Sequence, residues 1–236
     1  MLSFLLDLIF RKYLYRDRHE RRIGVYYPSE IGFCIRSLWY AYKYPRELPM
    51  KTLLLFESGI SAHEWLTKVL TETKTIEIGS DIIANIEVIP EGEVEYKVDD
   101  GVMVRGRFDE LLHIRFNKNG KTYDSLIELK TARDIKKIRE VKLHHYMQIN
   151  FYMKVLGIEQ GYVMYLDRKD YNYKIFEVKL NEKLFQELID RVKYLHYCLK
   201  YNQIPEPEGT KPRMRWMCIY CQYNDICKVG LHGMVG

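Results

Sequence analysis

The sequence predicts a mixed α/β fold in which helices flank a central sheet, and three observations predict it. Apolar residues recur at helical spacing over 56–73, runs of alternating hydrophobicity follow between 82 and 114, and the apolar strand "YDSLIELKTA" precedes a long helix. The 236 residues are enough for one sizeable core. The formal net charge of +5 permits a polyanionic partner without requiring one.

The first ten residues, "MLSFLLDLIF", are apolar, but this run is too short to span a bilayer and it contains Asp7. Its charges follow the apolar run instead of preceding it, which argues against a signal peptide. The basic stretch from Arg11 to Arg22 predicts that an amphipathic helix continues from it. We expect this helix to pack on the body of the protein, with contact to DNA or to a membrane as the alternative.

The first elements of the core are a helix and a hairpin. The helix is expected over 56–73, with Ser58 as its N-terminal cap. The alternating runs "EVEYKV" and "VMVRGRFDELLHI" are joined by Asp99-Asp100-Gly101, which predicts a β-hairpin. "NKNGK" is then the turn that leads into the apolar strand.

The second half of the core alternates helices with a further hairpin. A long helix is expected over 134–156, ending at Gly157. "GYVMYLDRK" and "YKIFEVKL" predict another hairpin, and a helix over 181–200 leads into the proline-rich linker "IPEPEGTKPR". His144 and His145 in the long helix are adjacent, so we expect them to point to different helix faces, at the surface or toward DNA.

Four short motifs carry side chains that make chemical sense together. They are "SGISAHEW" with His63, "GRFD" with Asp109, "IELK" with Glu128 and Lys130, and "QINFY" with Gln148 and Tyr152. Residues i and i+2 of a strand share a face, so the carboxylate and the ammonium of "IELK" point into one pocket. Residues i and i+4 of a helix share a face too, which pairs the glutamine with the tyrosine.

Each motif taken singly also fits an ordinary structural role. A Glu-x-Lys strand is usually a solvated face, a lone aspartate after a strand is usually a turn residue, and a single histidine often only packs. Their order along the chain changes this interpretation. The residues before Glu128 are apolar, and a buried unpaired carboxylate there would be costly without a metal.

The five cysteines are unevenly spread, with Cys218, Cys221 and Cys227 in one short segment and Cys34 and Cys198 far from it. An odd number and this clustering favour a reduced, cytosolic metal site over a secreted disulfide framework. Cys198 lies in a helical run and is predicted to be a small buried hydrophobe. Four thiolates serve zinc as well as an iron–sulfur cluster, although zinc ligands usually come as two close pairs.

The order of the motifs resembles the RecB-type branch of the PD-(D/E)xK nuclease superfamily. The cysteine pattern is similar to that of the CRISPR-associated exonucleases of the fourth Cas family, in which one N-terminal and three C-terminal cysteines hold an iron–sulfur cluster. Cys34 and the Cys-x₂-Cys-x₅-Cys of Cys218, Cys221 and Cys227 match these positions over about 26–228. Where the family commonly has proline after the first cysteine, this chain has Ile35.

The resemblance implies a PD-(D/E)xK nuclease core with an iron–sulfur clasp, 4Fe-4S in preference to 2Fe-2S, formed by the N- and C-terminal segments. It divides the chain into an N-terminal helical segment (1–55), the nuclease core (56–200), and a linker with the C-terminal cluster-binding segment (201–236). The donor types suit Mg²⁺ or Mn²⁺. The expected metal ligands are His63, Asp109, Glu128 and, by resemblance, the main-chain carbonyl of Leu129.

The remaining pocket residues receive roles in the reaction. Lys130 is expected to orient the attacking water and to stabilise the charge that develops on the phosphate. Gln148 and Tyr152 are expected to position the substrate or the lysine.

The resemblance implies a cytoplasmic DNA exonuclease that acts on single strands, from 5′ to 3′, and trims spacer precursors with the CRISPR integrase. Further copies of this chain are another candidate partner, and a membrane is not expected. The motifs fit a viral or DNA-repair nuclease equally well, because they carry no record of genomic neighbours. A non-catalytic DNA-binding protein on the same fold is the third hypothesis, and the presence of every expected catalytic residue type argues against it.

Overall fold

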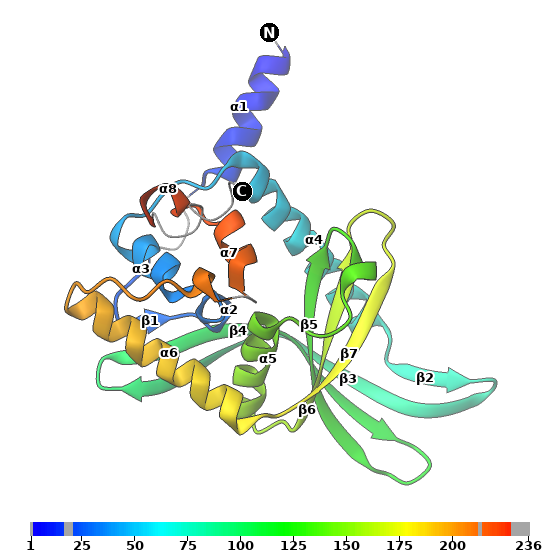
Figure 1. The fold of residues 1–236 in the computed structure, drawn as a ribbon. Coiled ribbons are helices and arrows are strands. Elements are labelled where there is room, and N and C mark those ends of the chain that lie inside the picture. The colour runs from blue at the N-terminus through cyan, green and yellow to red at the C-terminus, as the bar shows by residue number, and fades with distance from the viewer. Residues whose placement is uncertain (1, 17–20, 212–213, 228–236) are drawn as a thin grey trace.

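A seven-stranded mixed sheet with the order β2-β3-β4-β5-β6-β7, beside which β1 pairs with β4, forms the centre of the computed structural model (Figure 1). The model describes residues 2–16, 21–211 and 214–227. The strands are β1 (Val25–Tyr26), β2 (Thr75–Ile78), β3 (Asp81–Asp99), β4 (Val102–Phe116), β5 (Thr122–Ala132), β6 (Gln160–Asp167) and β7 (Tyr173–Lys179). The pairs β1–β4 and β5–β6 are parallel, and the other pairs are antiparallel.

Helices cover both faces of this sheet. They are α1 (Leu2–Leu14), α2 (Pro28–Ile31), α3 (Ile35–Lys43), α4 (Met50–Glu72), α5 (Leu143–Leu156), α6 (Glu182–Lys200), α7 (Arg215–Ile219) and α8 (Asn224–Cys227), with 3-10 turns η1 (Ile135–Lys137) and η2 (Glu208–Thr210). Within the described residues, no helix is both long enough and apolar enough to cross a membrane.

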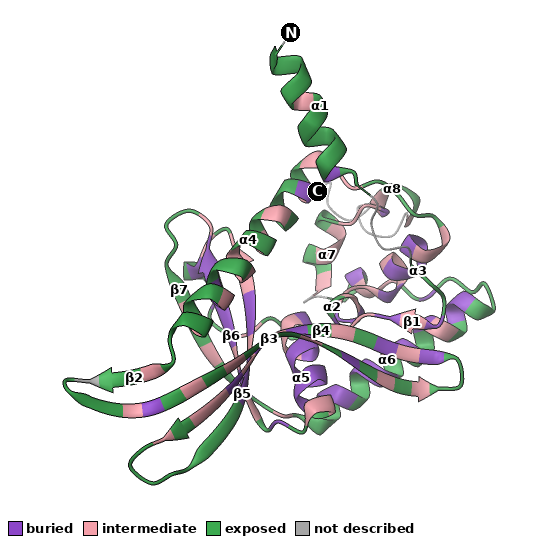
Figure 2. Ribbon diagram, turned by 180° about the vertical axis from the view of Figure 1, so that it is seen from behind, coloured by how far each residue is buried: buried purple, intermediate pink, exposed green. Residues whose placement is uncertain are grey.

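The alternation of side chains along β5 and β6 separates two layers of core. Leu126 and Val163 belong to the large core shared with α5 and α6, while Leu129 and Leu166 pack with Leu66 of α4 in a small cluster. Because neighbouring strand residues point to opposite faces, α4 lies over one face and α5 over the other. Figure 2 shows the buried positions concentrated where these layers meet.

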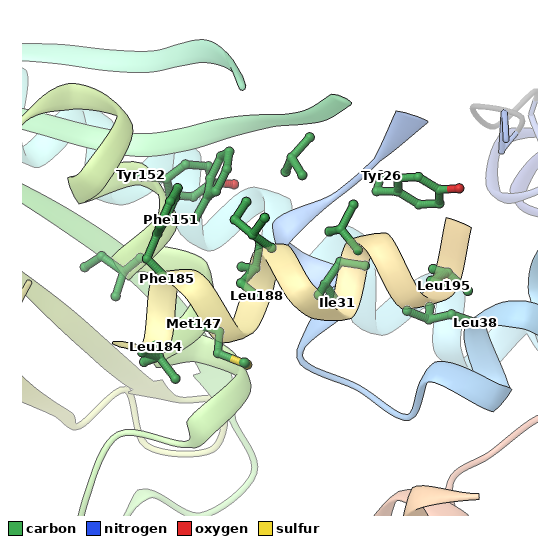
Figure 3. Close-up of a cluster of buried hydrophobic side chains, with 14 of the residues drawn as sticks. Tyr26, Ile31, Leu38, Met147, Phe151, Tyr152, Leu184, Phe185, Leu188 and Leu195 are labelled. Atoms are coloured by element: carbon green, nitrogen blue, oxygen red, sulfur yellow. The ribbon is translucent and has the colours of Figure 1, made fainter. Parts of the chain in front are cut away.

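Helix α6 is the centre of the large core. Leu188, Val192 and Leu195 on one of its faces are fully buried. Figure 3 shows Leu188 and Leu195 among side chains that come from α2, α5 and α3. Burying each such side chain stabilises the fold by about 1.5–3 kcal/mol. Cys198 on the same helix is 2% exposed, which confirms the prediction that it is a buried hydrophobe.

Both predicted hairpins, β3–β4 and β6–β7, are confirmed, and so is the end of α5 at Gly157, which adopts φ +70°. The predicted start of α5 is wrong. The helix begins at Leu143, because the preceding segment forms η1 and the N–H of Ile135 is held by the carboxylate of Asp167 at 3.0 Å. The carboxylate that makes this contact lies on β6, and the hydrophobic periodicity of the helix segment carries no information about it.

The predicted cap of the first core helix is also wrong. Helix α4 begins at Met50, directly after Pro49, so Ser58 lies inside the helix. Proline fixes a backbone φ compatible with helix entry but lacks a capping side chain, and no side-chain cap bond is present there. The apolar periodicity therefore located the helix but missed its first two turns.

Helix α1 does not pack on the body as expected; it projects from it in both views (Figures 1 and 2). Among its described residues only Leu14 is buried, and Arg16 after it pairs with Glu57 of α4 at 3.0 Å. The helix ends at Leu14, and residues 17–20 of the predicted basic extension lie outside the described residues. Its exposed large side chains are Leu2, Phe4, Leu5, Leu6, Leu8, Ile9, Phe10 and Tyr13.

Candidate active site and cysteine cavity

The candidate active site lies in a fork where β4 separates from β5. The ladder between the two strands runs from Arg115 and Thr122 to Glu110 and Ile127 and stops there. Beyond the end of this ladder, the N–H of Leu129 donates to Oδ2 of Asp109 at 2.7 Å in place of a backbone carbonyl. The strand separation therefore brings a carboxylate into the sheet, and Asp109 lies within a long strand instead of ending one.

Glu128 and Lys130 lie on the same face of β5, as the sequence predicts. Nζ of Lys130 is 2.5 Å from Oε1 of Glu128, which is 1% exposed. Burial and, to a smaller extent, the neighbouring Asp109 carboxylate raise the pKa of Glu128 to about 7, although the charge and hydrogen bond of Lys130 act in the opposite direction. Burial lowers the pKa of Lys130, but the two carboxylates outweigh it, so the net shift is upward. Lys130 is therefore an ammonium at neutral pH.

Asp109 meets His63 from the opposite wall of the fork. Nδ1 of His63, on α4, is 3.2 Å from Oδ2 of Asp109. Burial raises the pKa of Asp109 to about 6. Burial and the charge of Lys130 lower the pKa of His63, so its ring is neutral at pH 7 and can offer a nitrogen lone pair.

Gln148 and Tyr152 reach the site from α5, and both are buried. Nε2 of Gln148 lies 3.5 Å from the hydroxyl of Tyr152. A Cβ atom at Gly106 would lie 2.7 Å from Cε1 of Tyr152, so glycine on β4 allows the ring to lie against the strand. In the described residues neither side chain hydrogen-bonds to Lys130.

A cavity of about 600 Å³ connects these groups. All predicted pocket residues except Glu128, which lies behind Lys130, line it. Glu91 and Arg107, which the sequence reasoning missed, line it too and form an ion pair at 3.2 Å. Arg107 precedes Asp109 by two residues and so shares its strand side, and this alternation was the signal that could have found it.

The donor set of the fork fits a divalent cation. Glu128 is a buried carboxylate and Asp109 a partly buried one, and the charge of Asp109 raises the pKa of Glu128, a repulsion that a bound cation would relieve. Across residues 2–16, 21–211 and 214–227, no three His, Cys, Asp or Glu side chains stand ready arranged as a metal-binding group. The oxygen and nitrogen donors thus share one cavity without forming a closed ligand set.

His144 and His145 contact different elements, as expected of adjacent helix residues, but the prediction that they lie at the surface or toward DNA is wrong. Their ring centroids are 4.1 Å apart, and His144 is 7% exposed. His144 also lies against Trp216 of α7 at 5.4 Å, while Nδ1 of His145 is 2.8 Å from the hydroxyl of Tyr165. Burial lowers the pKa of His144 to about 4, so the ring is a neutral packing element.

Four cysteines line one small cavity of about 20 Å³ between α3, α7 and α8. They are Cys34, Cys218, Cys221 and Cys227, all of them free thiols, and Figure 1 shows the C-terminal helices beside the N-terminal α3. Burial raises the pKa of Cys218, and the three other cysteines raise it further. A Cβ atom at Gly209 would lie only 2.0 Å from Sγ of Cys218. Four soft sulfur donors around a position that only glycine leaves open fit a cysteine-ligated metal centre.

Charged side chains fasten the chain ends around this cavity. Glu208 of the linker pairs with Arg191 of α6 at 2.5 Å, and both side chains are largely buried. Its second oxygen accepts the N–H of Ile35 at 2.7 Å, which caps α3 directly after Cys34. Arg191 also donates to the carbonyl oxygens of Ile31 and Phe33. One buried ion pair therefore joins three segments that are distant in sequence.

Comparison with known proteins agrees with this geometry. The family model of the PD-(D/E)XK nuclease superfamily matches residues 36–228. The chain is 27% identical over 231 residues, 97% of its length and 98% of the relative's, to the CRISPR-associated exonuclease Cas4 of Saccharolobus solfataricus. It also has the fold of the solved structure of SSO0001, with a TM-score of 0.58, 23% identity, and coverage of 98% of this chain and 97% of that one.

Proposed function

The chain belongs to the PD-(D/E)XK nuclease superfamily, and we propose that it is a metal-dependent DNA exonuclease that degrades single strands from the 5′ end. The observation that carries this proposal is the fork between β4 and β5, which gathers His63, Asp109, Glu128 and Lys130 in and behind one cavity. The 27% identical relative is named as an exonuclease, which supports the mode of attack.

The fork would hold Mg²⁺ or Mn²⁺ through His63, Asp109, Glu128 and the carbonyl oxygen of Leu129. When bound, such a cation supplies Lewis-acid activation of the scissile phosphate and of the attacking water. Asp109 and Glu128 lie against the sheet on fixed backbone, so they need little rearrangement to bind it. The hydrogen bond from the Leu129 N–H keeps the Asp109 carboxylate in place.

Lys130 supplies the positive charge that the transition state requires. Its pKa is raised, so the ammonium is charged when the phosphate oxygens gain negative charge, and in a buried site this attraction is stronger than in water. The ion pair with Glu128 fixes the ammonium before the substrate arrives. Gln148 and Tyr152 would position the substrate strand at the wall opposite His63.

The cysteine cavity would hold an iron–sulfur cluster, 4Fe-4S in type, through Cys34, Cys218, Cys221 and Cys227. Its contribution is structural, because a group that binds both chain ends converts its binding energy into folding energy. Free thiols in this number fit the reducing cytoplasm. We propose the corresponding three-part division of the chain, with the segments 1–55 and 201–236 closing around the core 56–200.

The biological setting that we propose is CRISPR adaptation, in which the enzyme trims single-stranded ends of spacer precursors beside the integrase. Support comes from the printed name of the relative, a CRISPR-associated exonuclease, whose length this chain covers almost entirely. The same chemistry on a viral or repair substrate would use the same residues.

The decisive experiment is a cleavage assay on end-labelled single and double strands, with and without Mn²⁺, on protein purified without oxygen. We expect metal-dependent shortening of the single strand from its 5′ end, and iron with acid-labile sulfide in a brown preparation. Cys218→Ser should remove the iron. Absence of cleavage with Mg²⁺ and with Mn²⁺ would overturn the nuclease proposal. A colourless protein with stoichiometric zinc would overturn the proposal of an iron–sulfur cluster.

A further inference from the structure

A second cavity, of about 720 Å³, adjoins the candidate active site on the other flank of α4. The two cavities share Thr131, the residue directly after Lys130 on β5. The second cavity is lined from α4 by Trp65 and Ser61 and from the end of β6 by Arg168. The two cavities therefore meet the same residue of β5 from the two sides of α4.

Exposed aromatic rings dominate this second cavity. Trp65 is 50% exposed, Tyr173 is 60% exposed and Tyr171 is 74% exposed. Large rings at such exposure, gathered from two separate elements around one hollow, are typical of a binding surface and not of a core. Their flat faces suit planar, unpaired nucleobases, which stack on aromatic side chains whatever the base.

The charge of the cavity agrees with a nucleic-acid ligand. Arg168 is partly buried, and its guanidinium has no ion pair or hydrogen bond to a carboxylate within the described part of the chain. An unpaired guanidinium beside aromatic rings can bind a phosphate bidentately or stack on a base. Ser61 adds a hydroxyl on the α4 side.

The turn between β6 and β7, which carries Arg168 and Tyr171, is held in a fixed shape. Asp167, which is 5% exposed, accepts the N–H groups of Ile135 at 3.0 Å and of Lys169 at 2.8 Å. The N–H of Arg168 donates to the carbonyl oxygen of Ala132 at 2.9 Å. Tyr171 adopts φ +58°, a left-handed conformation that tyrosine seldom takes. The aromatic rings are therefore held in position before a ligand binds, which lowers the conformational entropy that the protein loses on binding.

We propose that this cavity, lined by Trp65, Arg168, Tyr171 and Tyr173, is a stacking subsite for the unpaired bases next to the scissile phosphate. This inference rests on the proposed function and names the residues that would select its single-stranded substrate. A strand whose phosphate lies at Lys130 continues past Thr131 into the aromatic cavity, where only separated bases can stack. Paired bases expose no faces for this contact, so the subsite selects single strands over duplex.

The first test measures binding of a short fluorescent oligodeoxythymidine by anisotropy, without divalent metal so that no cleavage occurs. Trp65→Leu and Tyr173→Leu are each expected to weaken binding about tenfold, since each removes one stacking partner. Trp65→Phe and Tyr173→Phe keep a ring and should stay within about threefold of the wild type. Tyr201→Leu, at an exposed tyrosine at the end of α6, is the matched control and should bind normally.

A second test separates this subsite from the chemistry itself. Bis(p-nitrophenyl) phosphate is a phosphodiester too small to reach both cavities, so Mn²⁺-dependent hydrolysis by Trp65→Leu should equal that of the wild type. Its KM for the oligonucleotide should instead rise about tenfold. If wild-type protein cleaves neither substrate, the proposed function fails, whereas the binding experiment still tests the subsite.

Two outcomes would overturn the subsite. Equal affinity of the leucine variants and the wild type for single strands would remove the stacking contact. A changed oligomeric state of Trp65→Leu in size-exclusion chromatography, with unchanged DNA affinity, would make this surface an interface between copies of the chain. Oligonucleotides with 2-aminopurine at successive positions sharpen a positive result, because only the base seated on the rings should be quenched.

Discussion

The fork between β4 and β5 and the cysteine cavity are built in opposite ways. In the fork, reactive side chains project from adjacent strands, and a backbone N–H orients Asp109 directly. In the cysteine cavity, the thiols come from segments at both ends of the chain, held by side-chain contacts such as Arg191 with Glu208. The fork therefore depends on the sheet, whereas the cavity depends on long-range pairs.

Because of this difference, a substitution in the fork should affect activity, whereas a substitution around the cysteine cavity should affect stability. Removing a charged group in the fork leaves the sheet and its core in place, so activity is lost and the fold remains. Removing a contact around the cysteines loosens the chain ends, so stability should fall together with the content of the proposed metal centre.

The largest expected effect is on cleavage by fork variants. Lys130→Ala should lower kcat by about 10²–10³-fold, because it removes a charge that acts on the transition state. Asp109→Ala and Glu128→Ala should lose at least as much, since each removes a proposed metal ligand. All three should keep their iron content and circular dichroism. Wild-type cleavage rates in Lys130→Ala and Glu128→Ala would show that the site lies elsewhere.

The largest expected loss of stability is that of Arg191→Ala. It leaves the carboxylate of Glu208 buried and unpaired and frees two carbonyl oxygens, so we expect about 3–5 kcal/mol less free energy of unfolding. Chemical denaturation followed by circular dichroism measures it. Arg46→Ala, whose pair with Asp225 is more exposed, is the control and should lose no more than about 1 kcal/mol. Equal losses would contradict the role of the buried pair.

Gly209→Ala tests the cysteine cavity without removing a ligand. The added methyl group would lie 2.0 Å from Sγ of Cys218, so the sulfur must move, at an expected cost of about 1–3 kcal/mol. Bound iron per chain should fall with it. Gly59→Ala, on a helix where nothing lies within 4 Å, should keep its iron. Full iron content in Gly209→Ala would count against a site between these four thiols.

The pH dependence of metal stabilisation distinguishes the fork from other buried acids. Burial raises the pKa of Asp109 to about 6 and of Glu128 to about 7. These raised values stabilise the metal-free fold at low pH, and this contribution is lost as the pH rises through about 6 and 7. A cation needs the ionised forms, so Mn²⁺ should raise the Tm more at about pH 8 than at about pH 5.5.

Two variants control that measurement. Glu128→Gln should lose most of the Mn²⁺ effect on Tm. Glu110→Gln should keep it, because the Glu110 carboxylate accepts a hydrogen bond from Thr67 of α4 and is not among the proposed ligands. A pH-independent Mn²⁺ effect would contradict binding by carboxylates with raised pKa values.

The smallest expected effect is that of Cys198→Ser. This residue lies in the α6 core away from the other cysteines, so the substitution should cost about 1 kcal/mol for burying a hydroxyl and leave the iron content unchanged. Denaturation and iron analysis on one preparation measure both quantities. Loss of iron would place Cys198 among the ligands and would contradict the separation of the α6 core from the cysteine cavity.

The sequence by itself determined the elements whose signals are local. The hairpin at Asp99-Asp100-Gly101, the helix end at Gly157 and the buried position of Cys198 all follow from turn chemistry or periodicity within a few residues. The pairing of Glu128 with Lys130 follows from strand alternation for the same reason. The candidate site residues were predicted from the order of their motifs along the chain, because local structure alone does not assign a function to any one of them.

Tertiary structure decided the features that depend on distant partners. The late start of α5 results from Asp167 on β6, and the contact of His144 with Trp216 joins segments about a third of the chain apart. Helix α1 has the apolar residues of a packed helix, yet the body offers only Leu14 a place in the core. The cavity lined by aromatic residues beside Thr131 likewise exists only once α4 and the β6–β7 turn meet. Periodicity records which face of an element is apolar, but whether another element covers that face is settled only by packing between segments far apart in sequence.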